Sequence, residues 1–264
     1  MRIVDTHCHL EQPEYQQDLE EVLQRAHHSG VVMITSAIHV QDYERTLGIA
    51  REHDDVYAAF GLDPIEFKHH EGARTAIRMS AGKLVAVGET GLDHYMVRDH
   101  NERDLQERAF RSLIELAIEL RLPIQVHSRS AGAKALEVLR SENAESVHMH
   151  AFDGKASLAA AASRDLGYYF SIPTSVTHSP QKMKLAKAVD IDRLLLETDS
   201  PVLSADRNSR NEPANVWIAL REVSRILGRE EEELRRIVLE NTLRIYPAVG
   251  LRKSSREENP EHSS

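Results

Sequence analysis

The sequence contains one cysteine, Cys8, and one tryptophan among its 264 residues. A single cysteine excludes an intramolecular disulfide framework and any zinc site built mainly from cysteine. No segment approaches the roughly 18 consecutive apolar residues that a membrane helix needs. The first residues, Met1 to Asp5, lack the charged and then apolar pattern of a signal peptide. We therefore expect a cytoplasmic protein without a membrane partner.

A surplus of basic residues is also absent. The 33 Lys and Arg residues are outnumbered by 42 Asp and Glu residues, which gives a formal net charge of -9. This balance argues against broad electrostatic capture of nucleic acid by the surface and leaves only localised contacts open. Hydrophobic residues make up 41% of the chain and charged residues 28%, which predicts a folded core under a solvated surface and excludes global disorder.

The sequence does contain a regular alternation of short apolar runs with longer amphipathic stretches. Eight of the apolar runs have the length and composition of β-strands. These runs are Arg2–Thr6, Val31–Ala37, Val56–Gly61, Leu84–Glu89, Ile124–His127, Val147–His150, Gly167–Ser171 and Leu194–Glu197.

The amphipathic stretches between these runs have the apolar spacing of helices, every third or fourth residue. The predicted helices are Leu19–His28, Gln41–Glu52, Glu102–Leu120, Ala131–Ser141, Ser157–Arg164, Pro180–Ala188, Asn215–Leu227 and Glu230–Tyr246. The stretch between Gly61 and Leu84 shows no clear helical period.

Alternating strands and helices predict parallel strands joined by helical crossovers. At about 150 residues per domain the length allows one or two domains, and the even repeat favours a single α/β unit, a (β/α)8 TIM-type barrel over residues 1–250. A doubly wound open sheet is the alternative. It would place a glycine-rich phosphate turn after the first strand, where the sequence has His7-Cys8-His9. Residues 251–264 are polar and charged, and we expect them to form a disordered tail.

Histidines and carboxylates fall at the carboxyl ends of the predicted strands. In a barrel of this kind these ends form the open mouth, where catalytic groups gather. His7 and His9 are two residues apart, so both imidazoles project to the same side of an extended strand. The six residues that meet the criterion are His7, His9, Glu89, His127, His150 and Asp199.

Each of the six has an ordinary structural explanation when taken alone, as a hydrogen-bonded histidine or a helix cap. Together they would leave several buried polar or charged groups uncompensated, at a cost of a few kcal/mol each. One or two divalent cations would remove this cost. Mixed His, Asp and Glu ligation suits zinc, manganese, iron or magnesium, so the sequence predicts a metal site at the mouth without choosing the metal.

The remaining histidines receive weaker assignments. His148 shares a strand face with His150 and lies deeper, so we expect it to support the metal site or the core. His94 and His178 are secondary candidates for the mouth. The histidines assigned to polar surface loops are His69, His70, His94 and His100.

Three motifs carry a resemblance to a known family. They are Asp5-Thr6-His7-Cys8-His9-Leu10, Val87-Gly88-Glu89-Thr90-Gly91-Leu92-Asp93 and Leu196-Glu197-Thr198-Asp199-Ser200-Pro201. Together with Arg210-Asn211-Glu212-Pro213 and Asn241-Thr242-Leu243-Arg244, they make the sequence similar to the TatD family of metal-dependent hydrolases, which belongs to the amidohydrolase-like barrels. The resemblance runs from Asp5 to about Gly250.

The resemblance implies two divalent metal ions, with magnesium, manganese and zinc as candidates. It makes His7 and His9 ligands of one metal, Glu89 a carboxylate that bridges both, and His127 and His150 ligands of the second. Asp199 completes the first site and handles the proton of the attacking water. Asp199 and Glu89 are therefore the expected catalytic residues.

The implied function is hydrolysis of DNA by a phosphodiesterase or deoxyribonuclease, including 3′ to 5′ exonuclease action through a metal-bridging hydroxide. Arg129 and Arg210 are the candidates for holding substrate phosphates. Where the family usually has Gly-x-His-Pro, this chain has Gly61-Leu62-Asp63-Pro64, which places Asp63 at the substrate side. An anionic Asp63 would repel a phosphate.

That departure keeps a second hypothesis open, an ester or amide hydrolase of the same superfamily such as an aminoacyl-tRNA deacylase or a cyclic amidohydrolase. The expected partner is accordingly DNA or another phosphodiester or ester substrate at the barrel mouth, with no obligate protein partner. A non-catalytic binding protein on a retained barrel is a third alternative, which the complete ligand set disfavours.

Overall fold

The computed structural model describes residues 1–250. The tail predicted over 251–264 lies outside the described residues. Within the described part, no helix has both the length and the apolar character that crossing a membrane requires.

Eight strands form one sheet in the order in which they occur in the chain, and every neighbouring pair from β1 to β8 is parallel. The strands are β1 (Ile3–Cys8), β2 (Val31–Ala37), β3 (Val56–Phe60), β4 (Leu84–Gly91), β5 (Ile124–His127), β6 (Val147–Met149), β7 (Tyr169–Ile172) and β8 (Leu194–Leu196). The chain after β8 then returns to β1, because the Asp199 amide donates to the His7 carbonyl at 2.9 Å and the His9 amide donates to the Ser200 carbonyl at 2.8 Å. The predicted (β/α)8 barrel is confirmed.

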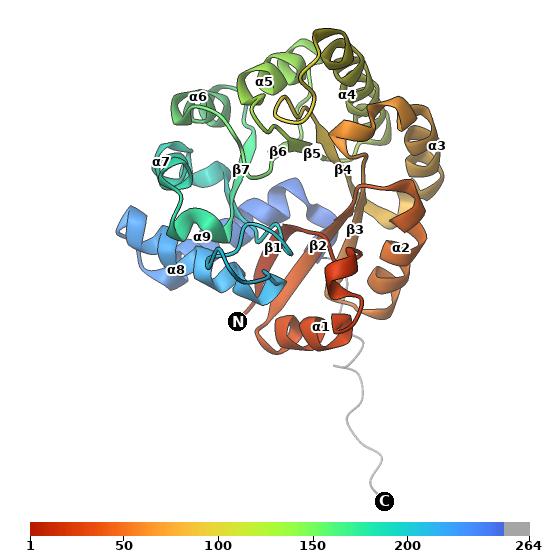
Figure 1. The fold of residues 1–264 in the computed structure, drawn as a ribbon. Coiled ribbons are helices and arrows are strands. Elements are labelled where there is room, and N and C mark those ends of the chain that lie inside the picture. The colour runs from red at the N-terminus through yellow and green to blue at the C-terminus, as the bar shows by residue number, and fades with distance from the viewer. Residues whose placement is uncertain (251–264) are drawn as a thin grey trace, which may run out of the picture.

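Helices surround the strands as a ring when the barrel is viewed along its axis (Figure 1). They are α1 (Leu19–His28), α2 (Tyr43–Glu52), α3 (His70–Ser80), α4 (His100–Leu120), α5 (Gly132–Ser141), α6 (Ala156–Asp165), α7 (Pro180–Ala188), α8 (Val216–Leu227) and α9 (Glu231–Ile245). Short 3-10 helices are η1 (Pro13–Tyr15), η2 (Val40–Asp42), η3 (Pro64–His69), η4 (Ala81–Lys83), η5 (Thr174–Thr177), η6 (Ile191–Arg193), η7 (Pro213–Asn215) and η8 (Pro247–Gly250).

Helix α3 is the element that the sequence analysis did not place. Its only fully buried residues are Ala73 and Ile77, so the apolar stripe is too short to give a clear period. The assignment of His69, His70 and His100 to loops was wrong, since His69 is the last residue of η3 and the other two are the first residues of α3 and α4. Polar residues are common in a first helical turn, where four backbone N–H groups lack helical partners.

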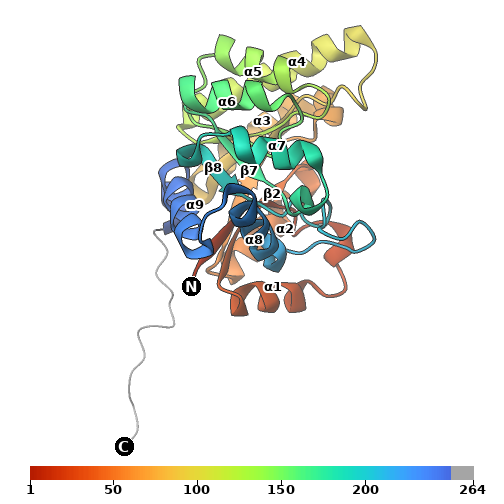
Figure 2. The same ribbon diagram turned by 90° about the vertical axis from the view of Figure 1, so that its left-hand side faces the viewer.

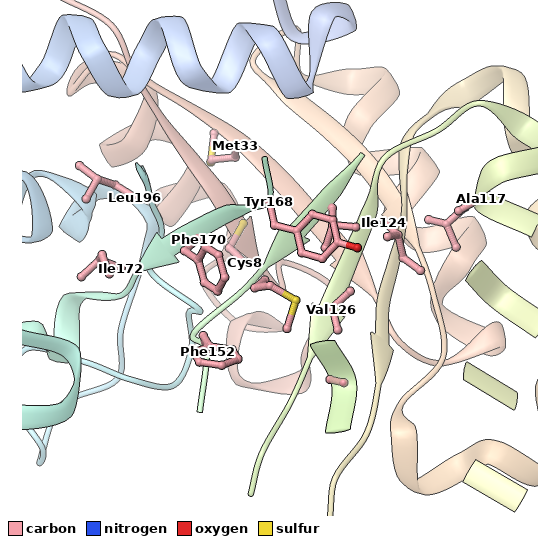
Figure 3. Packing of buried hydrophobic residues seen from close by; sticks show 14 of the residues in the cluster. Cys8, Met33, Ala117, Ile124, Val126, Phe152, Tyr168, Phe170, Ile172 and Leu196 are labelled. Carbon is pink, nitrogen blue, oxygen red and sulfur yellow. The ribbon is translucent and has the colours of Figure 1, made fainter. Parts of the chain in front are cut away.

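Apolar side chains that point out of the strands pack against the ring of helices. Figure 3 shows Cys8 of β1, Val126 of β5 and Phe170 of β7 within this cluster. Phe152 meets Phe170 edge to face, with ring centroids 5.3 Å apart. Burial of this outer layer holds the helices on the barrel.

The side chains that point into the barrel form a second, smaller core at its amino-terminal end. Helix α9 and η8 close this end, and Figure 2 shows α9 there beside the N-terminus. Tyr246, which follows α9, is completely buried. Its hydroxyl donates to His148 Nδ1 at 2.7 Å and accepts from Gln125 Nε2 at 3.1 Å. The floor of the barrel is thus tied to the polar side chains above it.

Replacing Tyr246 tests this floor. Tyr246→Phe keeps the ring, leaves His148 Nδ1 without a partner and leaves Gln125 Nε2 with only the Thr6 carbonyl, so we expect the free energy of unfolding to fall by about 1–3 kcal/mol. Tyr246→Ala also removes the ring and should cost about 3–5 kcal/mol. Urea denaturation followed by circular dichroism measures both. Equal stability of Tyr246→Phe and the parent would contradict the assigned hydrogen bonds.

Candidate metal centre

His7 and His9 lie at the carboxyl end of β1, with their Nε2 atoms 3.2 Å apart. Each Nδ1 atom faces a group that can only accept a hydrogen bond: His7 Nδ1 donates to Gln125 Oε1 at 3.0 Å, and His9 Nδ1 donates to the Ser36 carbonyl at 2.8 Å. Both Nδ1 atoms therefore carry the ring proton. In their neutral forms the two imidazoles turn their Nε2 lone pairs into the same space.

Glu89 of β4 lies between two pairs of imidazoles. Its Oε2 is 3.2 Å from His7 Nε2 and 3.3 Å from His9 Nε2. Its Oε1 is 2.7 Å from His127 Nδ1 and 3.0 Å from His150 Nε2. Burial alone would raise the pKa of Glu89, but the surrounding imidazoles hold it well below its ordinary value. Glu89 is thus an ionised carboxylate with one oxygen directed at each pair.

Asp199 follows β8 and completes the arrangement on the β1 side. Its backbone has a positive φ of 54°, and its amide bond to the His7 carbonyl fixes its place beside β1. Oδ1 is 3.4 Å from His9 Nε2 and 3.6 Å from His7 Nε2. Burial raises the pKa of Asp199, but hydrogen bonding to His9 and the nearby histidine charges lower it below its usual range. A second carboxylate therefore remains ionised at the site.

The six residues predicted from the strand ends all come together in the structure. Their candidate ligand atoms form three overlapping groups, each with all atoms within 4.8 Å of one another. The groups are His7, His9 and Glu89; His7, His150 and Asp199; and Glu89, His127 and His150.

This arrangement fits divalent cations. Lone pairs of neutral imidazoles that face carboxylate oxygens repel unless positive charge lies between them. In the metal-free protein, protons supply that charge: despite burial, neighbouring carboxylates raise the pKa of His9 well above its ordinary value. Metal ions would displace these protons, as they do when they bind histidine in general.

The ligand set is held by further polar residues. His127 Nε2 donates to Asp93 Oδ2 at 3.0 Å, and Asp93 Oδ1 accepts from the Tyr95 and Met96 amides at 3.0 and 2.8 Å. A carboxylate in this position fixes which imidazole nitrogen faces the metal and raises its basicity. Burial lowers the pKa of His127, but Asp93 and Glu89 raise it from 6.5 to about 10.

A chain of buried hydrogen bonds runs below the ligands, within the barrel. Gln125 Nε2 donates to the Tyr246 hydroxyl, which donates to His148 Nδ1; His148 Nε2 then donates to Ser171 Oγ at 2.6 Å. Ser171 Oγ donates to Glu197 Oε2 at 2.6 Å. Burial lowers the pKa of His148 well below its ordinary value, which keeps the ring neutral as this chain requires. All donors therefore point from Gln125 toward Glu197.

The two ends of this chain meet metal-ligand candidates. Gln125 accepts from His7, and Glu197 Oε2 is 4.0 Å from His150 Nδ1. That His150 nitrogen is buried and has no hydrogen-bond partner within residues 1–250. Burial raises the pKa of Glu197 to about 8. His148 thus lies below the ligand candidates, as expected, and its support of a metal site stays a prediction.

Asp93, Gln125 and Glu197 are supporting residues that were not predicted from the sequence. Gln125 precedes His127 by two residues and Glu197 precedes Asp199 by two, so the two-residue strand spacing that selected His7 and His9 could also have found them. Asp93 lies in a loop, where no such period applies.

Two glycines let the backbone approach the site closely. A Cβ atom on Gly61 would lie 2.0 Å from the Glu89 carbonyl oxygen, and one on Gly91 would lie 2.0 Å from the His127 carbonyl oxygen. Gly91 also has a φ of 150°, which side chains disfavour. Only glycine fits at these positions.

The residues predicted to bind substrate occupy other environments. The Arg129 guanidinium stacks over the Tyr95 ring, 4.0 Å from its centroid. Arg210 pairs bidentately with Asp18, at 2.8 and 2.5 Å. Asp63 accepts from the Ile65 amide at the start of η3, and burial raises its pKa, with the Glu89 charge acting in the same direction. Their contacts are thus with neighbours other than the ligand cluster.

The ion pair between Asp93 and His127 predicts that the stability of the metal-free protein depends on pH. A histidine whose pKa is raised on folding stabilises fully below its unfolded value and loses that effect as pH rises through its folded value. The contribution of His127 should therefore decline between pH 6.5 and about 10. Asp93→Asn should make the free energy of unfolding fall less over this pH range. The measurement is the free energy of unfolding at each pH in the presence of a chelator.

A matched control for this change is Asp55→Asn. Asp55 pairs with exposed His27 at 2.9 Å on the surface, and exposed pairs contribute little. This variant should keep the pH profile of the parent. An unchanged profile in Asp93→Asn would refute the role of the buried pair.

The chain is similar to known metal-dependent hydrolases over nearly its whole length. The profile of the "TatD related DNase" family matches residues 4–247. Human "Deoxyribonuclease TATDN3" is 34% identical over 262 residues, covering 94% of this chain and 95% of the relative. An uncharacterized metal-dependent hydrolase of Methanocaldococcus jannaschii is 30% identical, with 93% and 97% of the two chains covered. 

A solved structure shows the same fold. The crystal structure of YJJV, a TatD homologue from Escherichia coli, superposes with a TM-score of 0.85 at 26% identity, covering 93% of this chain and 98% of that one.

Proposed function

The chain belongs to the TatD-related DNase family and is a metal-dependent hydrolase, and from that membership we propose that it hydrolyses phosphodiester bonds of DNA with two divalent cations. The proposal rests on the position of Glu89, whose two carboxylate oxygens face separate pairs of imidazoles. A carboxylate shared in this way is suited to bridge two cations. Magnesium, manganese and zinc are the candidate metals.

The distances support the following ligand roles. His7 and His9 with Asp199 serve one position, and His127 with His150 serve the other, while Glu89 serves both. Two cations held by these residues would activate a water molecule and would neutralise charge on the phosphoryl and leaving oxygens.

The protein's own side chains handle protons and orientation. Asp199 is ionised, because its pKa lies below the usual range, and so it can accept the proton of the attacking water. Asp93 accepts a hydrogen bond from His127 Nε2, which keeps the ring proton on that nitrogen and leaves Nδ1 free to face Glu89. Gln125 likewise accepts a hydrogen bond from His7 Nδ1, which leaves His7 Nε2 free to face Glu89.

Membership of the TatD-related DNase family favours the nuclease over the ester or amide hydrolase, and the departure from the family pattern at Asp63 has a local structural role. Burial raises the pKa of its carboxyl, and Oδ1 is engaged by the Ile65 amide. The Asp63 carboxyl therefore has a hydrogen-bond partner of its own at the start of η3.

Loss of a ligand should remove metal and activity together. His7→Ala or Glu89→Ala should lower bound metal, measured by elemental analysis, and should reduce turnover at least 100-fold, since metal activation typically supplies several kcal/mol. The matched control is His27→Ala, whose imidazole pairs with Asp55 on the surface. Circular dichroism should show all three variants folded. Unchanged metal content in His7→Ala and Glu89→Ala would disprove the site.

Substrate class is tested separately with the parent protein. Nucleotide release from single-stranded DNA is compared with turnover of aminoacyl esters and cyclic amides, each with magnesium, manganese and zinc. We expect nucleotide release to exceed ester and amide turnover. Ester or amide turnover without nucleotide release would establish the alternative function instead.

A further inference from the structure

A pocket of about 670 Å³ opens between the segment after β7 and the loop after β8. Pro201 of its wall is two residues from Asp199, a span of at most about 7 Å. Three hydrogen bonds hold the loop in place: Thr174 Oγ1 donates to the Leu203 carbonyl at 2.7 Å, Thr177 Oγ1 to the Ala205 carbonyl at 3.2 Å, and His178 Nε2 to the Ser204 carbonyl at 3.0 Å. The pocket walls are therefore held in place by hydrogen bonds beside the candidate metal centre, and the pocket has a size typical of ligand sites.

Arg207 supplies an oriented cation at this pocket. Its Nε donates to His178 Nδ1 at 3.3 Å, and His178 is itself fixed by its bond to the Ser204 carbonyl. The two terminal nitrogens of the guanidinium have no acceptor within residues 1–250. The neighbouring Asp206 carboxylate instead accepts from the Asn208 amide and the Ser209 hydroxyl. The side of Arg207 that binds phosphate bidentately is left available.

Lys182 adds a second positive charge to the lining. Only 9% of this residue is exposed. Its Nζ donates to the Ala151 and Phe152 carbonyls at 2.6 and 2.9 Å, just after the ligand candidate His150. An ammonium group has three donors, and these carbonyls account for two. The pocket thus combines two cations, although the chain as a whole carries a net charge of -9.

The other part of the lining is apolar. Pro180, Val202 and Leu203 contribute to the wall, and Val202 is 54% exposed. A phosphate needs the cations, whereas a sugar or base gains from an apolar surface. A nucleotide carries both kinds of group.

We infer that this pocket binds the nucleotide next to the scissile phosphodiester bond, with Arg207 holding its phosphate and Val202 and Leu203 contacting its sugar or base. The inference rests on the proposed function and deepens it. Arg207 takes the role that sequence analysis gave to Arg210 and Arg129, whose guanidinium groups are engaged by Asp18 and Tyr95.

The test compares Arg207→Gln and Val202→Glu with the parent and with Arg164→Gln as the matched control. Arg164 is exposed on α6, near the end of that helix. Each protein is assayed on a single-stranded oligonucleotide and on bis(4-nitrophenyl) phosphate, a diester without a neighbouring nucleotide. Arg207→Gln should raise KM for the oligonucleotide about tenfold, as expected for a lost charge-assisted phosphate contact, and Val202→Glu should also raise it, because its carboxylate would repel the phosphate and replace the apolar contact. This loss should exceed any loss on the small diester.

A binding measurement keeps the inference independent of activity. Calorimetric titration of dAMP into metal-free protein should give a Kd about tenfold weaker for Arg207→Gln than for the parent and for Arg164→Gln. The salt dependence of oligonucleotide binding should also become shallower by about one phosphate contact. Equal dAMP affinity and equal oligonucleotide KM in the parent and in Arg207→Gln would overturn the inference.

Failure of the pocket assignment and failure of the proposed function give different experimental results. If the parent hydrolyses DNA and Arg207→Gln matches it in KM and in binding, only the pocket assignment is wrong. If the parent hydrolyses no DNA with any metal, the proposed function fails, and dAMP binding still decides whether the pocket accepts a nucleotide.

Discussion

The Glu89 carboxylate is the constraint on which the rest of the site depends. A buried carboxylate is costly unless positive charge and hydrogen-bond donors surround it. Four imidazoles meet that need, two at each oxygen. To bring them there, strands β1, β4 and β5 and the end of β6 must present their carboxyl ends to one point. The closed barrel satisfies this requirement because all eight strands are parallel.

The interior of the barrel is organised in layers. Apolar side chains and Tyr246 fill the floor, a polar layer follows, and the ligand candidates occupy the mouth. In the polar layer the hydrogen bonds run in one direction, because neutral His148 can accept at Nδ1 only if it donates at Nε2. The orientation of His7 on one side is thereby connected through the barrel to the carboxylate of Glu197 beside His150.

Charge at the mouth resolves the apparent conflict between an acidic protein and a polyanionic substrate. The overall charge of -9 acts over the whole surface and is screened by salt within about 10 Å. In the proposed reaction, bound cations and local basic side chains would dominate near the site. The pocket beside Asp199 supplies such side chains, Lys182 and Arg207. Under the proposed function, capture of substrate would therefore depend on the local placement of charge rather than on the net charge.

Much of the fold and the ligand set could be predicted from sequence because both follow short periods. Alternation along a strand places His7 with His9 on one face, and parallel pairing brings the strand ends together. Helix α3 escaped prediction because only Ala73 and Ile77 mark its buried side. The sequence by itself determined the barrel and the residue types at its mouth.

Only the tertiary structure decided how those side chains are paired. Arg210 is engaged by Asp18, 192 positions away in the chain, and Tyr246 reaches His148 across 98 positions. No local pattern encodes such contacts, because they depend on where the closed barrel places distant segments. The same holds for the imidazole nitrogens of His7 and His9 that face Glu89, which are set by partners on the other strands β5 and β2. Residue identity specifies which chemistry is available, and three-dimensional packing specifies which atoms remain free to perform it.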